Sequence, residues 1–92
     1  MRIQCVTISE EAEDKIIAEH GVTFANVESV LLGDPYVCQA KGQRYMAIGL
    51  DDTPRFVTVI FEYSQGEAEV VTAYPSSDWQ IRLYRRKKRG RR

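Results

Sequence analysis

The sequence is poor in the residues from which metal centres and disulfide frameworks are built. Its 92 residues include two cysteines, Cys5 and Cys38, a single histidine, His20, and no Cys-x-x-Cys pair. Disulfide-stapled secreted domains carry more cysteines at regular spacing, and structural zinc sites need several Cys or His ligands. We therefore expect two reduced thiols buried as small apolar side chains, with neither a metal nor a cofactor.

Long apolar runs are absent as well. No stretch reaches the roughly 18 residues that a membrane-spanning helix needs. Residues 1–6 are too short and too polar for a secretory signal peptide. These absences predict a cytoplasmic protein without a membrane partner. The length predicts one small domain, 1–89, followed by a basic disordered tail, 90–92, and association into a homodimer or hetero-oligomer is a further expectation.

The formal net charge of zero conceals a strong segregation of charge along the chain. Residues 1–81 hold five basic and thirteen acidic residues, a net of −8, whereas residues 82–92 hold eight basic residues and no acidic one. A basic block of this density typically binds nucleic acid, an acidic partner or a membrane surface. The acidic remainder repels RNA, so we expect any RNA contact to be confined to the basic end.

Helical periodicity and capping residues predict two helices in the first third of the chain. Hydroxyl caps and carboxylates in the first turns favour a helix over residues 9–20, which Gly21 ends. Apolar residues at helical spacing predict a second helix over residues 23–32. The Gly-Asp-Pro sequence at 33–35 ends that helix, because proline disfavours helical conformation in the residue before it.

The period of the apolar residues then changes to two. Four alternating segments are joined by short turns, and they span residues 36–40, 44–50, 55–63 and 67–74. This pattern predicts a four-stranded antiparallel sheet. The segment 55–63 is apolar on both faces, so it is expected to lie centrally.

The basic end of the chain is predicted to form a third helix. Residues 75–78 break the last strand and offer N-caps. We expect Trp79, Ile81 and Leu83 to dock this helix on the sheet, which leaves its basic residues on the open side. The predicted fold class is α+β, with two N-terminal helices, four antiparallel strands and a C-terminal basic helix, in the order α-α-β-β-β-β-α.

Several short motifs along these segments resemble those of a known family. They are His-Gly-Val-Thr-Phe at 20–24, Gly-Asp-Pro at 33–35, Arg-Tyr-Met-Ala-Ile-Gly at 44–49, Val-Val-Thr-Ala at 70–73 and Arg-Leu-Tyr at 82–84. In this order and spacing the chain resembles the BrnT ribonuclease toxins of type II toxin–antitoxin systems. The resemblance implies a RelE-like fold and metal-independent cleavage of RNA that inhibits translation. It also implies a partner like the antitoxin BrnA, a ribbon-helix-helix DNA-binding protein.

The chain departs from the family pattern at several polar positions. Where the family has an aromatic–acidic pair and then a lysine, this chain has Ile8, Ser9 and Ala12. Ser64 stands in place of a frequent arginine, and Thr-Ala-Tyr at 72–74 stands in place of Ser-Ala-Arg. Two alternatives follow, a ribonuclease whose site is rebuilt from other side chains, or a non-catalytic RNA- or protein-binding module on the same fold.

Metal-free RNA cleavage requires a base for the ribose 2′-hydroxyl, an acid for the leaving 5′-oxygen and cations for the phosphate. The candidate catalytic residues are Arg44, Tyr74, Thr72 and His20. The candidate RNA-binding residues are Tyr45, Tyr63, Arg82, Arg85 and Arg86. Glu62 is a further carboxylate that is either a base or the surface partner of an arginine.

Each candidate also has a purely structural interpretation. Arg44 opens a strand, where it either holds phosphate or pairs with an acidic neighbour at the sheet rim. His20 ends a helix, where the helix dipole favours a cation without any catalytic role. The tyrosines either stack on bases or lie at the edge of the core. The ribonuclease hypothesis therefore requires the basic helix to fold back and share one concave surface with Arg44 and the tyrosines.

Overall fold

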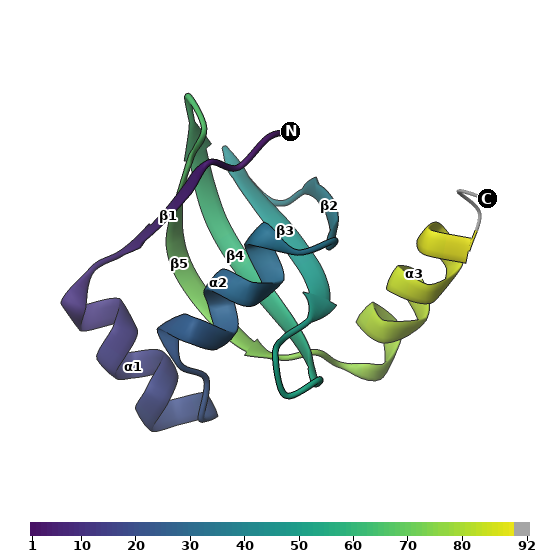
Figure 1. Cartoon of the computed structure of the whole chain (residues 1–92), viewed down its shortest axis with the longest axis horizontal. Coiled ribbons are helices and arrows are strands. Elements are labelled where there is room, and N and C mark those ends of the chain that lie inside the picture. The colour runs from purple at the N-terminus through teal and green to yellow at the C-terminus, as the bar shows by residue number, and fades with distance from the viewer. Residues whose placement is uncertain (90–92) are drawn as a thin grey trace.

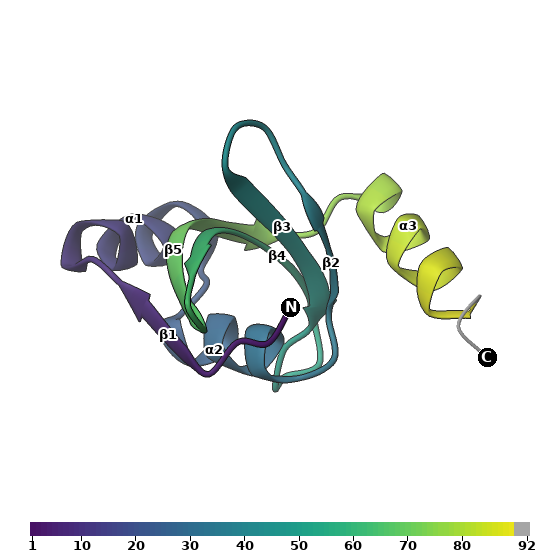
Figure 2. The same ribbon diagram turned by 90° about the horizontal axis from the view of Figure 1, so that it is seen from above.

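One curved sheet organises the chain, of which the computed structural model describes residues 1–89 (Figure 1). The strands are β1 (Cys5–Ile8), β2 (Tyr36–Gln39), β3 (Arg44–Leu50), β4 (Phe56–Ser64) and β5 (Glu67–Pro75). The helices are α1 (Glu10–His20), α2 (Phe24–Leu32) and α3 (Asp78–Arg89). Two helices lie on one side of the sheet and α3 lies apart from them on the other (Figure 2). The predicted tail, 90–92, falls outside the described residues.

The sheet of residues 1–89 has five strands in the order β1-β5-β4-β3-β2. The predicted antiparallel pairs are confirmed, but β1 adds a fifth strand that runs parallel to β5. The prediction of a purely antiparallel four-stranded sheet is therefore wrong, and the element order is β-α-α-β-β-β-β-α. The pairing joins Cys5 to Glu67, so no short turn in the sequence signals it.

The inner face of the sheet, which α1 and α2 cover, carries the core. On β4, Val57, Val59 and Phe61 point to this face and are completely buried. They pack with Ile16 of α1 and with apolar residues of α2, including Val27. The hydroxyl cap expected for α1 is confirmed at Ser9, whose side chain accepts a bond from Ala12 N, and Thr23 caps α2 by accepting a bond from Asn26 N. These buried side chains of β4 form the apolar surface against which the two helices pack.

The expectation of two buried thiols is wrong for one of them. Cys5 is exposed, because it begins the edge strand β1 and alternates with Val6 and Ile8, which pack against the core. Cys38 is partly buried on β2. Burial raises the pKa of the Cys38 thiol, and the nearby charge of Lys87 opposes that rise without cancelling it. Neither thiol forms a disulfide.

The outer face of the sheet, opposite α1 and α2, receives α3 through a buried amide. Gln80 is 2% exposed and is the buried residue of α3. Its Oε1 accepts bonds from Thr58 Oγ1 at 3.0 Å and from Ser77 N at 2.9 Å. Its Nε2 donates to Tyr74 Oη at 3.1 Å. Because a buried amide must find its partners within the protein, these bonds fix where the first turn of α3 sits.

Further contacts hold the rest of α3 in place. The rings of Phe56 and Tyr84 meet edge-on, with centroids 5.3 Å apart. Nearer the end of the helix, Lys88 Nζ donates to Asp34 Oδ1 at 2.7 Å. The expected docking through Trp79 is wrong, since that side chain is 54% exposed. The helix turns Gln80 toward the sheet instead, because the hydroxyl groups there match an amide and not an indole ring.

The β3–β4 loop is built around the carboxylate of Asp51. Its Oδ1 accepts bonds from Thr53 N, Thr53 Oγ1 and Arg55 N, at 2.9, 2.6 and 2.8 Å. Arg55 Nε lies 3.4 Å from Asp51 Oδ2. Arg55 Nη2 donates to Gly21 O and Asn26 Oδ1, both at 3.4 Å. The loop therefore fastens the sheet to the end of α1 and the start of α2.

Asp51 stabilises the fold in a pH-dependent way. Burial alone would raise the pKa of Asp51, but the bonds from Thr53 and Arg55 and the charge of Arg55 outweigh it and hold the pKa below its usual value. A carboxylate with a lowered folded pKa stabilises the protein fully above its unfolded pKa of about 3.9. That stabilisation is lost as the pH falls through the lower, folded pKa.

We predict that Asp51→Asn lowers the free energy of unfolding by on the order of 2 kcal/mol at neutral pH, because bonds to a charged acceptor are lost. The loss should shrink as the pH falls below about 4, because the unfolded carboxylate is then protonated, and it should be smallest below the lower, folded pKa of Asp51. Urea unfolding at neutral pH and at about pH 3 measures both values. Asp14→Asn, on the exposed side of α1, is the matched control. An equal loss at both pH values would contradict the assignment.

We predict that Gln80→Leu lowers the free energy of unfolding by about 1–3 kcal/mol, because it leaves the buried Thr58 hydroxyl without one of its partners. Gln39→Leu, at an exposed position of β2, is the control and should change stability by less than about 0.5 kcal/mol. Urea unfolding at neutral pH compares the two variants. Equal stability of both variants would show that the amide does not hold α3.

Candidate active site

His20 and Tyr74 are two predicted catalytic residues that the structure brings together. His20 is the last residue of α1, because Gly21 takes the left-handed conformation, with φ 65°, that ends the helix. Tyr74 lies near the end of β5. Their ring centroids are 6.0 Å apart and the rings are tilted by 55°. The His20 side chain is 35% exposed, so an imidazole that solvent reaches lies beside a phenol.

The hydroxyl of Tyr74 is held by a chain of polar groups beneath α3. Gln80 Nε2 donates to it, and the same amide accepts a bond from Thr58. Thr58 Oγ1 lies 2.7 Å from Ser76 Oγ, which extends the chain to the segment between β5 and α3. Tyr74 Oη accepts the bond from Gln80, so its own O–H remains a donor. The arrangement orients a phenol hydroxyl next to an acid–base side chain.

Thr72 lies on the outer face of the sheet, as Tyr74 does, but nearer the middle of the strand. It lies two residues earlier on β5 and pairs with Ile60 of β4. Its side chain is half-buried. The structure therefore places Thr72 beside the His20–Tyr74 pair along the strand, further from the end of the sheet.

Arg44 lies at the other end of the sheet. It begins β3 opposite Glu62, and Arg44 Nε is 3.6 Å from Glu62 Oε2. Ile48, four residues further along β3, is level with Thr58 and hence with Tyr74 on β5. Four residues of strand span about 13 Å. The single concave surface that the ribonuclease hypothesis requires for Arg44 and the tyrosines is therefore not formed. Arg44 instead pairs with the acidic Glu62 at the rim of the sheet.

Tyr45 and Tyr63 lie on the inner face, away from Tyr74. The Tyr45 ring stacks on Phe61 with centroids 5.8 Å apart, and it meets Tyr63 edge-on at 6.4 Å. Tyr63 Oη donates to Arg2 O at 2.7 Å. Both rings pack against the core cluster. They therefore form an aromatic edge of the core, and the structure does not bring them to the His20–Tyr74 pair.

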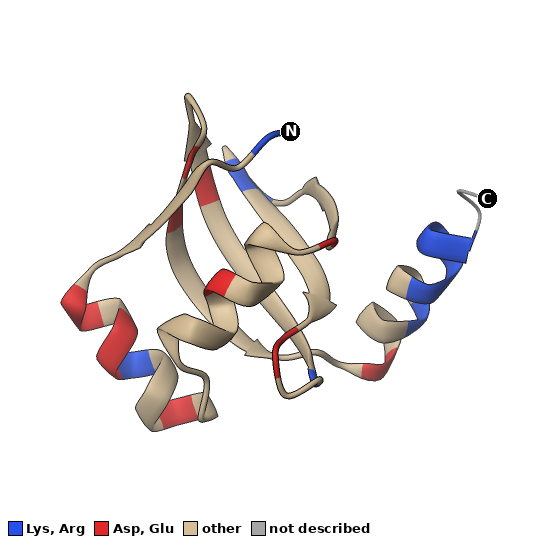
Figure 3. Ribbon diagram, in the orientation of Figure 1, with Lys and Arg blue, Asp and Glu red and all other residues tan. Residues whose placement is uncertain are grey.

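The predicted basic residues gather along α3. Four exposed arginines line a shallow hollow of about 460 Å³, and they are Arg82, Arg85, Arg86 and Arg89. Arg85 Cζ lies 5.5 Å from the centre of the Phe56 ring, which holds one of them against the sheet. In Figure 3 the C-terminal half of this helix is largely basic, whereas acidic residues occupy α1, α2, the β3–β4 loop and the far end of the sheet. The separation of charge along the sequence is thus also a separation in space.

Two further residues of this region gave little signal in the sequence. Gln80 is a polar residue at a position that faces the sheet, so a search for apolar periodicity passes over it. Arg55 follows what reads as a simple turn, yet its guanidinium donates to the carbonyl of Gly21, directly after His20. The sequence signal that could have located Gln80 is a pair of hydroxyl-bearing residues, Thr58 on β4 and Ser76 after β5. Such residues favour a buried polar contact.

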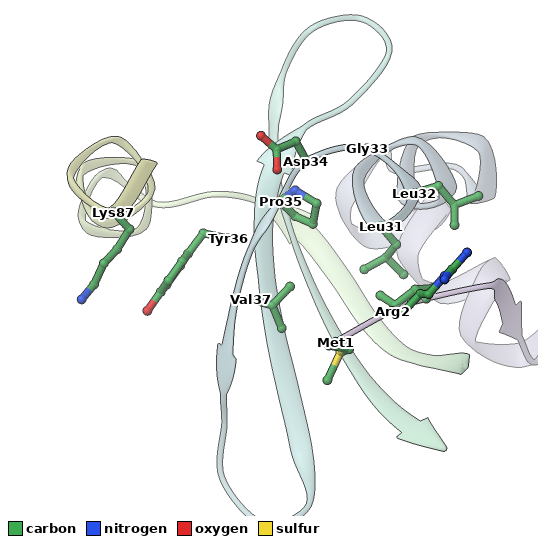
Figure 4. Close-up of a pocket in the computed structure, with 11 residues that line it drawn as sticks. Met1, Arg2, Leu31, Leu32, Gly33, Asp34, Pro35, Tyr36, Val37 and Lys87 are labelled. Atoms are coloured by element: carbon green, nitrogen blue, oxygen red, sulfur yellow. The ribbon is translucent and has the colours of Figure 1, made fainter. Parts of the chain in front are cut away.

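A second hollow, of about 590 Å³, lies at the edge strand β2 (Figure 4). Tyr36 and Lys87 lie on one side of the strand there, and the apolar Leu31 lies on the other. Asp34 at its rim is bonded to Lys88. The lining of this hollow includes no imidazole and none of the four candidate catalytic residues.

The described part of the chain offers neither a metal-binding cluster nor a membrane-spanning helix. Across residues 1–89, no three His, Cys, Asp or Glu side chains converge in a way that could ligate a metal ion. The helices of that same part are too short or too polar to span a bilayer.

Comparison with known proteins identifies a structural relative. The crystal structure of the ribonuclease toxin BrnT of Brucella abortus matches with a TM-score of 0.68 and 27% sequence identity. The match covers 80% of this chain and 97% of that chain. No family model and no curated protein matches the chain. The resemblance that the sequence motifs suggest is confirmed at the level of the structure, and the chain has a BrnT-like fold.

Proposed function

We propose that this chain is the toxin of a type II toxin–antitoxin system, a metal-independent endoribonuclease that inhibits translation in the cytoplasm. The observation that carries the proposal is the BrnT-like fold, because the structural match covers 97% of the B. abortus ribonuclease toxin. The proposed substrate is RNA. The proposed partner is an antitoxin like BrnA, with which the chain forms a hetero-oligomer.

The His20–Tyr74 pair is the proposed catalytic centre. The His20 imidazole takes the proton of a ribose 2′-hydroxyl, and the oxygen then attacks the neighbouring phosphorus. The bond from phosphorus to the 5′-oxygen breaks, and that oxygen takes a proton from solvent, which leaves a 2′,3′-cyclic phosphate and a 5′-hydroxyl. Tyr74 donates a hydrogen bond to a phosphoryl oxygen, and Gln80 keeps its hydroxyl in position. Thr72 provides a second hydroxyl on the same face.

The charge of the RNA phosphates is met by cations from two parts of the chain. Arg55 reaches the carbonyl that follows His20, and its side chain is 38% exposed although it also pairs with Asp51. Beyond Gln80, the exposed Arg82 and further arginines of α3 meet the charge of neighbouring phosphates along the same strand. A guanidinium group suits this role because its planar fork matches two phosphate oxygens.

The second candidate function is a non-catalytic RNA- or protein-binding module on the same fold. The position of Arg44 favours it, because this cation is paired with Glu62 at the far end of the sheet. The altered family positions, among them Ser64 and Tyr74, favour it as well. In this case the basic helix binds its partner and no RNA is cut.

We predict that induced expression in bacteria arrests growth and degrades RNA. His20→Ala and Tyr74→Phe should each lower the cleavage rate of purified protein about 100-fold or more, because the first removes the proposed base and the second removes the hydrogen bond to the phosphoryl oxygen. Tyr63→Phe is the matched control, since it removes a hydroxyl from the inner face. Arg44→Ala should have a smaller effect than His20→Ala.

The same experiment separates the two candidate functions. Cleavage is measured on an RNA transcript with a metal chelator present, and binding is measured on the same transcript. Normal growth and intact RNA at high expression, together with tight RNA or protein binding, would reject the ribonuclease and favour the binding module. Full activity of both His20→Ala and Tyr74→Phe would reject this catalytic centre.

A further inference from the structure

Trp79 is a large apolar side chain that the fold leaves in solvent. It is the single tryptophan of the chain, the second residue of α3, and 54% exposed. A lone exposed apolar residue is ordinary and needs no explanation. What distinguishes Trp79 is its surroundings, because the helix that carries it is otherwise lined with arginines.

The two sides of α3 have different tasks. One side carries Gln80, Tyr84 and Lys88, spaced by four residues, which contact the sheet and the loop before β2. The open side carries Trp79 and Arg82, three residues apart, and then Arg86 one turn further on. Residues three and four apart are neighbours on a helix surface. An indole ring and guanidinium groups therefore lie next to one another on a helix that is held firmly from behind.

The charges of the open side favour one kind of occupant. Four arginines surround the hollow on α3, and none of its lining residues is acidic. Within α3 the one acidic residue is Asp78, at the N-terminal end, where the helix dipole favours it. A surface that pairs an aromatic platform with a row of guanidinium groups complements a chain of phosphates whose bases are free to stack.

We propose that the open side of α3 binds a single strand of nucleic acid, with a base stacked on Trp79 and phosphates held by Arg82 and Arg86. A duplex does not fit this surface in the same way, because its bases are already stacked on one another. The inference rests on the proposed ribonuclease for its RNA substrate and adds how the strand is held. It places a binding surface on the helix whose first turn orients Tyr74.

The fluorescence of Trp79 tests the stacking directly, because no other tryptophan contributes to the signal. The full chain is titrated with a single-stranded 2′-O-methyl oligoribonucleotide of about ten residues, which cannot be cleaved by 2′-hydroxyl attack and is long enough for such a surface. Inorganic polyphosphate serves as a polyanion without bases. We expect saturable quenching by the oligonucleotide and none by polyphosphate, although both bind. Equal quenching by the two ligands, or none by either, would overturn the stacking proposal.

Variants separate stacking from charge, with affinities measured by anisotropy of a labelled oligonucleotide. Trp79→Ala should weaken oligonucleotide binding about 5- to 150-fold, the range for loss of one base–aromatic stack, while polyphosphate binding stays unchanged. Trp79→Tyr should retain most of the affinity. Arg82→Ala and Arg86→Ala should weaken both ligands and flatten the salt dependence. Leu32→Ala, another half-exposed apolar position, is the control and should change neither ligand.

The outcomes distinguish this inference from the proposed catalytic function. Tight oligonucleotide binding that depends on Trp79, without cleavage of natural RNA, would reject the ribonuclease and keep the binding surface. Cleavage with unchanged oligonucleotide affinity in Trp79→Ala would keep the ribonuclease and reject the surface. Tighter binding of an acidic peptide such as polyglutamate than of the oligonucleotide, with a larger change in Trp79 fluorescence, would assign this face to a protein partner. That result also rejects the proposal.

Discussion

The hydrogen bonds of one buried amide determine how the basic helix meets the sheet. Gln80 lies beneath α3 and bonds to Thr58 of β4 and to Tyr74 of β5. Since these groups are shielded from water, a shift of the helix would leave them without partners, at a cost of about 1–3 kcal/mol for each. The first turn of α3 is thereby fixed. Trp79, Arg82 and Arg86 consequently lie on the side of α3 that faces solvent.

A second polar centre brings the remaining part of the candidate site to the same end of the sheet. Asp51 and Arg55 order the loop between β3 and β4, and Arg55 reaches the carbonyl of Gly21 at the end of α1. That contact places the C-terminal end of α1, and hence His20, near the end of β5 where Tyr74 lies. Thus α1 supplies an imidazole, β5 a phenol and α3 the orienting amide. Acidic residues lie on α1, on α2, in the loop between β3 and β4 and at the far end of the sheet, whereas the basic cluster lies on α3 (Figure 3).

Local signals in the sequence predict most of the fold. The caps Ser9 and Thr23 predict where the two helices begin, and alternation of apolar residues predicts the four antiparallel strands. Segment 5–8 is not predicted as a strand, because its parallel partner lies some sixty residues away and no short turn joins the two. The basic helix is also predicted, but the side of it that faces the sheet is not. Apolar character favours Trp79 for that contact, whereas in the structure Gln80 makes it through hydrogen bonds.

The sequence predicts which residues are candidates for the site better than it predicts how close they lie to one another. His20 and Tyr74 stand out by their chemistry, but their proximity depends on how α1 packs against the sheet, which no local pattern encodes. Arg44 stands out as one of few cations before the basic helix. Its distance from Tyr74 follows from the pairing of Arg44 with Glu62, a register that alternation alone does not specify.

One RNA strand that passes from the open side of α3 to the His20–Tyr74 pair is the central claim of this account. Backbone amide NMR of the uniformly labelled protein, titrated with an uncleavable 2′-O-methyl strand, tests it most directly. The account predicts that the amide shifts concentrate in α3, at the C-terminal end of α1 and at the end of β5. Shifts concentrated around Arg44 and β1, with none near His20 and Tyr74, would contradict it.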